Sequence, residues 1–335
     1  MKTLVSITIS SLFLLSFCLY AQDKINGVSF VASPYPIDTS HMRQVEKANA
    51  NWVAVMPFGF MPSLNAPEIQ FDISGQWWGE RIEGARQTIR IAHRQGLRVM
   101  LKPQLWIRHG AFTGDISMTT EVDWQQLEHN YQEFILAFAK LAQEENVRLF
   151  CIGTELHSFV NQRSEFWENL VTKVKKIYSG QLTYAENWDK ISDVCFWDKL
   201  NYIGVDAYFP ISKDKTPTVA QSKMGWKNHV PVLKGLSTTY QTPVLFTEYG
   251  YRSVDYAGKE PWNSSRNYGQ VNLEAQENLL TGLFKSVWDQ PWFAGGFLWK
   301  WYAKYEGSGG PDDNRFTPQN KPALQTIARS YQNTE

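Results

Sequence analysis

Short apolar runs recur along the chain and alternate with segments of helical periodicity. Eight of these runs are rich in β-branched and aromatic residues, which is typical of buried strands. They occupy residues 25–31, 51–58, 97–106, 147–155, 181–187, 200–209, 243–251 and 293–302. The pattern therefore predicts eight strands, spread over most of the sequence.

The segments between the apolar runs place their hydrophobic residues at the spacing of an amphipathic helix. In residues 79–96 these side chains fall on one face, and Gly96 follows as a C-cap. Residues 122–145 and 271–290 keep the same spacing, and residues 320–332 supply a closing helix. Strands and helices are therefore expected to alternate.

Eight strands that alternate with helices in one domain predict a single (β/α)8 TIM barrel of the α/β class. The alternative is an open doubly wound sheet, which usually carries a glycine-rich phosphate-binding turn after its first strand. Residues 28–36, VSFVASPYP, stand at that place without such a glycine pattern. We therefore expect the barrel, in which chemistry takes place at the C-terminal ends of the strands.

The first residues have the composition of an export signal. Residues 1–21 read as a signal peptide, with Lys2 at the positive start and a short apolar stretch after it. The stretch is short for a membrane span and has no basic stop-transfer flank. A lipid anchor at Cys18 is the weaker alternative, because the bulky Phe17 precedes it. We expect an exported protein, secreted or periplasmic, with one domain over residues 22–335 and no membrane contact after signal removal.

Charge and cysteine content exclude several classes of protein. Lys and Arg number 33 and Asp and Glu number 33, so the formal net charge is zero. A nucleic-acid or anionic-membrane partner would favour a basic face, so neither partner is expected. We also expect the protein to be a monomer. Only Cys151 and Cys195 follow the signal, too few for a disulfide scaffold. We favour two free, buried thiols, and a single bridge is the alternative.

Two of the predicted strands end in a glutamate. CIGTE ends at Glu155 on the fourth strand, and LFTEYG contains Glu248 on the seventh. Burying a lone carboxylate is costly, so such a residue needs a partner or a function. Strands four and seven face each other across the mouth of an eight-stranded barrel, and glycoside hydrolysis requires such a pair of carboxylates. The alternative is that each glutamate forms a salt bridge with a Lys or Arg at the rim.

Other catalytic signatures are missing from the sequence. The six histidines are scattered, with no HxH on the first strand and no HExxH, so no metal site is expected. No GxSxG nucleophile elbow is present either. We therefore expect a reaction that needs no cofactor.

Four segments carry a family resemblance: GTEL at 153–156, FTEYGY at 246–251, FLWKWY at 297–302 and GPDDNRFTPQNKPA at 310–323. Together they resemble glycoside hydrolase family 113, the endo-β-1,4-mannanases of clan A, and the resemblance covers essentially the whole chain after the signal. It implies a retaining hydrolase of β-1,4-linked mannan or manno-oligosaccharides.

The resemblance also implies roles for the two glutamates. Glu155 would be the acid/base and Glu248 the nucleophile. The wider clan usually has Asn immediately before the acid/base, where it contacts the sugar 2-hydroxyl. This chain has Thr154 there, so the source of that contact stays open.

Several further residues are candidates for substrate binding. Lys102, Gln104 and Trp106 alternate along the third strand and share a face, which we place inside the barrel and toward its mouth. They are candidate contacts to sugar hydroxyls. For Lys102 the alternative is a pair with a core acid such as Asp206, which we expect to be a buried acid of the barrel rather than a third catalyst.

The ends of the later strands supply the remaining candidates. Tyr208 ends strand six and either hydrogen-bonds Glu248 or packs at the rim. Asn187 and Trp188 end strand five. Trp299 ends strand eight, and the resemblance implies that it forms the floor of the subsite at the cleaved sugar, with a core position as the alternative.

Two rival functions remain at this point. The first is the same chemistry on another β-linked glycan, such as a glucan or a galactan. The second is a carbohydrate-binding pseudoenzyme, which the presence of both glutamates argues against.

Overall fold

The computed structural model describes residues 24–265 and 269–332. The predicted signal peptide therefore lies outside the described residues. Within them, we find no helix with the length and apolar character needed to cross a membrane.

The part of the chain that the structure describes forms a closed barrel of eight parallel strands in the order β1-β10-β9-β8-β7-β6-β4-β2. The strands are β1 (Ile25–Phe30), β2 (Trp52–Val55), β4 (Arg98–Leu101), β6 (Leu149–Thr154), β7 (Gln181–Asn187), β8 (Tyr202–Asp206), β9 (Val244–Tyr249) and β10 (Phe293–Trp301). Each strand lies within one of the predicted apolar runs. The predicted (β/α)8 barrel is confirmed.

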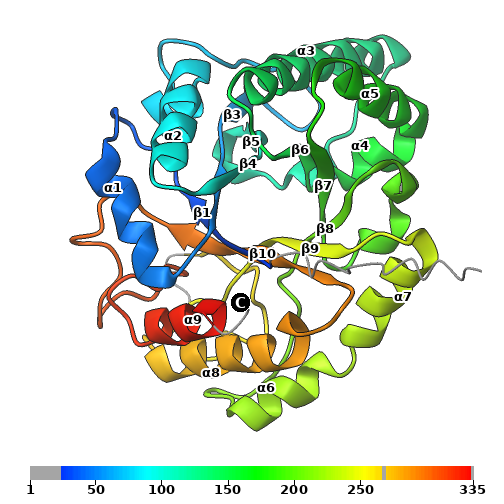
Figure 1. Cartoon of the computed structure of the whole chain (residues 1–335). Coiled ribbons are helices and arrows are strands. Elements are labelled where there is room, and N and C mark those ends of the chain that lie inside the picture. The colour runs from blue at the N-terminus through cyan, green and yellow to red at the C-terminus, as the bar shows by residue number, and fades with distance from the viewer. Residues whose placement is uncertain (1–23, 266–268, 333–335) are drawn as a thin grey trace, which may run out of the picture.

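Helices surround the barrel (Figure 1). They are α1 (Thr39–Arg43), α2 (Ile82–Arg94), α3 (Glu121–Glu144), α4 (His157–Gln162), α5 (Ser164–Ile177), α6 (Val219–Trp226), α7 (Val230–Tyr240), α8 (Leu273–Leu283) and α9 (Ala323–Gln332). The four segments with predicted helical periodicity coincide with α2, α3, α8 and α9, although α3 begins one residue earlier, at Glu121. The Thr120 hydroxyl caps α3 by accepting a hydrogen bond from the Asp123 N–H at 3.1 Å.

The third predicted strand is divided by a proline. Residues up to Leu101 stay in the barrel as β4, whereas β5 (Gln104–Ile107) follows Pro103 and pairs with β3 (Phe58–Met61) in a separate two-stranded sheet. Proline lacks the N–H that a continuous ladder needs, and Pro57 divides β2 from β3 in the same way. The sequence pattern did not predict this second sheet, which carries side chains past the mouth of the barrel.

The core has two layers. One lies between the strands and the helices, and the other fills the barrel. The inner layer consists of Ile25, Trp52, Ala54, Met100, Leu149, Cys151, Ala185, Tyr202, Leu245 and Phe297. Close filling of the interior makes the barrel a rigid support for groups at its mouth.

Both cysteines of the described chain are free thiols, as expected. Cys151 is buried in the inner layer, where burial raises the pKa of its thiol to about 11. Cys195 is exposed, so the prediction of a second buried thiol is wrong. Cys195 lies in the connection between β7 and β8, outside any strand, and its side chain faces solvent.

Candidate active site

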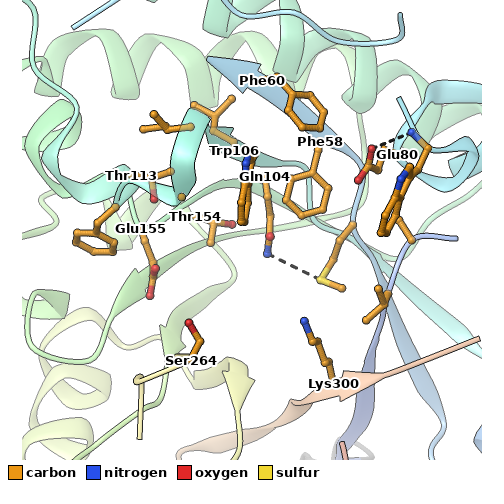
Figure 2. Close-up of a pocket in the computed structure, with 18 of the residues that line it drawn as sticks. Phe58, Phe60, Glu80, Gln104, Trp106, Thr113, Thr154, Glu155, Ser264 and Lys300 are labelled. Atoms are coloured by element: carbon orange, nitrogen blue, oxygen red, sulfur yellow. Dashed lines mark hydrogen bonds between the residues drawn. The ribbon is translucent and has the colours of Figure 1, made fainter. Parts of the chain in front are cut away.

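A cleft of about 970 Å³ lies at the C-terminal ends of the strands. Aromatic side chains form much of its wall, and Figure 2 shows Phe58, Phe60 and Trp106 gathered on one side of it. Trp106 and Trp77 are each 51% exposed and Trp262 is 46% exposed, although all three line the cleft. Flat apolar faces that remain open inside a cleft suit a ligand with apolar ring faces, such as a sugar.

Glu248 lies at the end of β9 and accepts three hydrogen bonds. Lys102 Nζ lies 2.6 Å and Gln104 Nε2 lies 3.0 Å from its Oε1 atom. The Tyr208 hydroxyl donates to Oε2 at 2.8 Å. These donors stabilise an ionised carboxylate and fix its orientation. The bond predicted from Tyr208 to Glu248 is present.

Lys102 is the centre of a buried ion cluster. Its ammonium also lies 3.2 and 3.3 Å from the two carboxylate oxygens of Asp206, and both side chains are fully buried. Burial alone would lower the pKa of Lys102, but the negative charges of Asp206 and Glu248 outweigh it and raise the pKa. Burial, with the Glu248 charge second, raises the pKa of Asp206 to about 7. The cation therefore stays charged beneath the cleft.

Glu155 has a different environment. It is half-buried, lines the cleft and points into the same space as Lys300 (Figure 2). Burial raises the pKa of its carboxyl well above the usual range, and the charges of Asp206 and Glu248 raise it further. The structure records no hydrogen bond to this carboxyl from the described residues. Glu155 is therefore suited to hold a proton.

Both glutamate strands carry an irregularity where they reach the mouth. Between β6 and β7 the register passes from Cys151↔Thr183 to Thr154↔Ala185. Between β8 and β9 it passes from Val205↔Phe246 to Asp206↔Glu248. An extra residue in a strand changes the direction of the side chains that follow it. On β6 this brings both Thr154 and the following Glu155 to the cleft.

The end of β10 contributes two neighbouring residues. Trp299, predicted as the floor of a subsite, lines the cleft and is not a core residue. Lys300 also lines the cleft, with its Nζ atom 4.9 Å from the centre of the Trp299 ring. Burial lowers the pKa of Lys300, against the opposing charge of Glu248. Strict alternation along a strand had not identified Lys300 as a site residue.

The 310–323 segment braces this side of the cleft. Lys321 and Asp313 form an ion pair of 2.8 Å, with the Lys321 side chain fully buried. Lys321 also donates to the Ser253 hydroxyl at 2.9 Å. The segment brings Phe316 to the cleft, where its ring lies 6.0 Å from that of Tyr208. The segment therefore supports the residue that orients Glu248.

The predicted substrate-binding residues separate into two groups. The cleft lining includes Gln104, Trp106, Tyr208 and Trp299. Lys102 is fully buried and pairs with Asp206, so the second of its two alternatives holds.

Asn187 and Trp188 are not among the residues that line the cleft. Trp188 is half-buried and stacks on Trp262, with ring centres 5.8 Å apart and planes inclined by 23°. Trp262, which comes from the loop after β9, is the one that faces the cleft. Sequence reasoning had assigned no role to it, and no strand periodicity reaches that loop.

No group of three or more His, Cys, Asp or Glu side chains in the described part of the chain is placed to hold an ion.

The buried cluster yields a prediction on stability. Lys102→Met leaves two buried carboxyl groups without their cation and should lower the free energy of unfolding by about 3–5 kcal/mol. The double variant with Lys102→Met and Asp206→Asn has one buried acid fewer and should recover part of the lost unfolding free energy. Urea unfolding followed by circular dichroism measures both variants, and an unchanged midpoint in Lys102→Met would contradict this reading of the cluster.

Comparisons with known proteins agree with the geometry. A model of glycoside hydrolase family 113 matches residues 36–321. The chain is similar to the GH113 β-mannanase AaManA from Alicyclobacillus acidocaldarius in complex with ManMIm, with 26% identity and a TM-score of 0.82, over 93% of this chain and 98% of that chain. A GH113 β-1,4-mannanase shares 22% identity with a TM-score of 0.80, over 92% of this chain and 99% of that chain.

A more distant structure shares only the fold. A β-glucuronidase from Faecalibacterium prausnitzii has 13% identity and a TM-score of 0.61, over 93% of this chain and 49% of that chain. No curated protein matches the chain. The family model covers well over half of the residues, and two solved structures of the same family share the barrel. The chain therefore belongs to glycoside hydrolase family 113 and is a glycoside hydrolase.

Proposed function

We propose that the enzyme cleaves β-1,4-mannosidic bonds in mannan or manno-oligosaccharides with retention of configuration, with Glu155 as acid/base and Glu248 as nucleophile. The observation that carries this assignment is the contrast between the two carboxyl groups. Glu248 accepts hydrogen bonds from Lys102, Gln104 and Tyr208, which favour its anion. Burial raises the pKa of Glu155, which favours its acid form. Two carboxyls with environments this different divide the roles of nucleophile and proton donor.

In the first step, Glu155 gives its proton to the glycosidic oxygen while the bond from that oxygen to the anomeric carbon breaks. A Glu248 oxygen attacks the same carbon and forms a glycosyl ester. In the second step the Glu155 carboxylate takes a proton from water, the water oxygen attacks the anomeric carbon, and Glu248 leaves as an anion. Lys102 stabilises that departing charge, because its ammonium lies 2.6 Å from Oε1.

The substrate class rests on the cleft and on the relatives. Open aromatic faces at Trp106, Trp77 and Trp262 suit successive neutral sugar rings. The two GH113 structures compared above, including that from Alicyclobacillus acidocaldarius, are described as β-mannanases. This similarity supports mannan over other β-linked glycans as the substrate.

The roles of the two glutamates can be separated by chemical rescue. Glu248→Ala and Glu155→Ala should each abolish hydrolysis of mannan while the far-UV circular dichroism stays that of a folded barrel. Azide should rescue both variants on an aryl β-mannoside, because a small anion can replace either carboxylate. Glu248→Ala should yield the α-mannosyl azide, since azide attacks directly, and Glu155→Ala the β-azide, since azide attacks the glycosyl ester. NMR of the products decides, and the reverse pattern would exchange the two roles.

The pH dependence follows from the raised pKa of Glu155. Glu155 must carry a proton at the start, so kcat/KM should fall as the pH rises through that pKa. In Glu155→Gln the alkaline fall should disappear on an activated aryl mannoside. An alkaline limb that persists unchanged in that variant would show that another group is the acid.

Digestion of a panel of polymers tests the substrate class. Mannan, cellulose, xylan and galactan are incubated with the wild-type enzyme and with Glu248→Ala as the blank. Manno-oligosaccharides are expected by mass spectrometry from mannan, with at least tenfold slower release of products from the other polymers. Faster release from cellulose or galactan would assign the enzyme to that polymer instead.

A further inference from the structure

The structure contains a buried acid that the two-step reaction does not use. Glu186 lies on β7 and is fully buried. Its Oε1 atom accepts a hydrogen bond from the Asn187 N–H at 2.8 Å, and its Oε2 atom accepts one from the Tyr184 hydroxyl at 3.1 Å. It is not among the residues that line the cleft. A buried carboxyl outside the cleft needs either a structural or a functional explanation.

Tyr184 connects this acid to the strand that carries Glu155. Its hydroxyl donates to Glu186 and accepts from the Leu156 N–H at 2.8 Å. The ring is fully buried, with its centre 5.4 Å from that of Trp167. Gly153 on β6 makes room for it, because a Cβ there would lie 2.9 Å from Tyr184 Cε2. The Tyr184 hydroxyl therefore has a fixed position beside the end of β6.

The residue immediately before Leu156 is Glu155, and its backbone is in an unfavourable conformation. Its φ of 51° lies in the left-handed region, which residues with a Cβ rarely adopt. The Glu155 N–H donates to the Ala185 carbonyl at 2.8 Å, and the next N–H, that of Leu156, donates to Tyr184. Two consecutive hydrogen bonds to β7 thus hold the turn that directs Glu155 into the cleft.

We propose that Tyr184 and Glu186 are positioning residues that hold the acid/base Glu155 in its reactive orientation from the helix-facing side of β7. The proposal rests on the function assigned to Glu155 above. Neither residue lines the cleft, so their effect on catalysis passes through the backbone at Leu156 and through the charge of Glu186.

Charged side chains near Glu155 come from β7, β8, β9 and the end of β4, and Lys300 of β10 points into the same space. Asp206, Glu248 and Glu186 are negative and raise the pKa of Glu155, whereas Lys102 is positive and lowers it. The charge of Glu186 itself depends on pH, because burial raises its pKa to about 7, with the charges of Asp206 and Asp189 adding to the effect. Above that pH an ionised Glu186 helps Glu155 to keep its proton. Neutralising Glu186 should therefore let Glu155 lose its proton at lower pH.

The leaving group of the substrate provides a test that a merely structural role would not pass. Tyr184→Phe removes the acceptor for the Leu156 N–H and should lower kcat/KM on manno-oligosaccharides about tenfold, because the acid is misplaced. A 2,4-dinitrophenyl β-mannobioside needs no proton on its leaving group. Its kcat/KM should stay within about twofold of the wild-type value.

The pH profile tests the charge of Glu186 separately. Glu186→Gln keeps the size of the side chain and removes its negative charge. The alkaline limb of kcat/KM on manno-oligosaccharides should move to lower pH by roughly half a unit. The acid limb of the same profile should move less.

Tyr178→Phe is the matched control, since it also removes one hydroxyl of a buried tyrosine, here bonded to the Val147 carbonyl at 2.8 Å and away from the cleft. It should leave the leaving-group dependence and the pH profile unchanged. Two results together would overturn the proposal. Tyr184→Phe would lower kcat/KM equally on manno-oligosaccharides and on the dinitrophenyl substrate, and Glu186→Gln would leave the alkaline limb of the pH profile where it is in the wild type. Glu155→Gln distinguishes a failure of this proposal from a failure of the function assigned to Glu155. If Glu155→Gln also lowers kcat/KM equally on both substrates, Glu155 is not the acid.

Discussion

The mouth of this barrel depends on one buried cation. Lys102 is removed from water entirely, which is tolerable only because two carboxylates, Asp206 and Glu248, surround its ammonium. Asp206 is held in turn by the Thr247 hydroxyl at 2.7 Å, and Glu248 by that of Tyr208 at 2.8 Å. The neighbouring strands β8 and β9 and the end of β4, on another side of the barrel, meet in this cluster. It fixes the orientation of the Glu248 carboxylate. The negative charges of Asp206 and Glu248 also help to raise the pKa of Glu155, so the two glutamates have contrasting environments.

Much of this arrangement follows from the sequence. The eight barrel strands lie where apolar runs predicted them, because a strand buried on both faces leaves a continuous apolar signature. The glutamates were recognisable because a carboxyl at the end of such a run is expensive to bury without a purpose. Tyr208 and Trp299 were found because strand ends in a barrel converge on one mouth.

The remainder depended on departures from regular geometry. Alternation along a strand assigns side chains to two faces, and bulges at the ends of β6 and β9 break that rule where the chemistry takes place. Lys300 and Trp262 were missed because one adjoins an inward residue and the other lies on a loop without periodicity. Alternation along β7 puts Tyr184 and Glu186 on one face, but it does not show that the Tyr184 hydroxyl bonds both Glu186 and the Leu156 N–H.

The division of two strands by prolines has a consequence for the evolution of this enzyme. β3 and β5 pair with each other in a sheet separate from the closed barrel, yet they supply Phe58, Phe60 and Trp106 to the cleft wall. Gln104 at the start of β5 is tied to Glu248, but substitutions at the other residues beyond Pro57 and Pro103 act on the wall without altering the register that closes the barrel. The fold thus separates a part that has to be conserved for closure from a part that is free to adapt to new glycans.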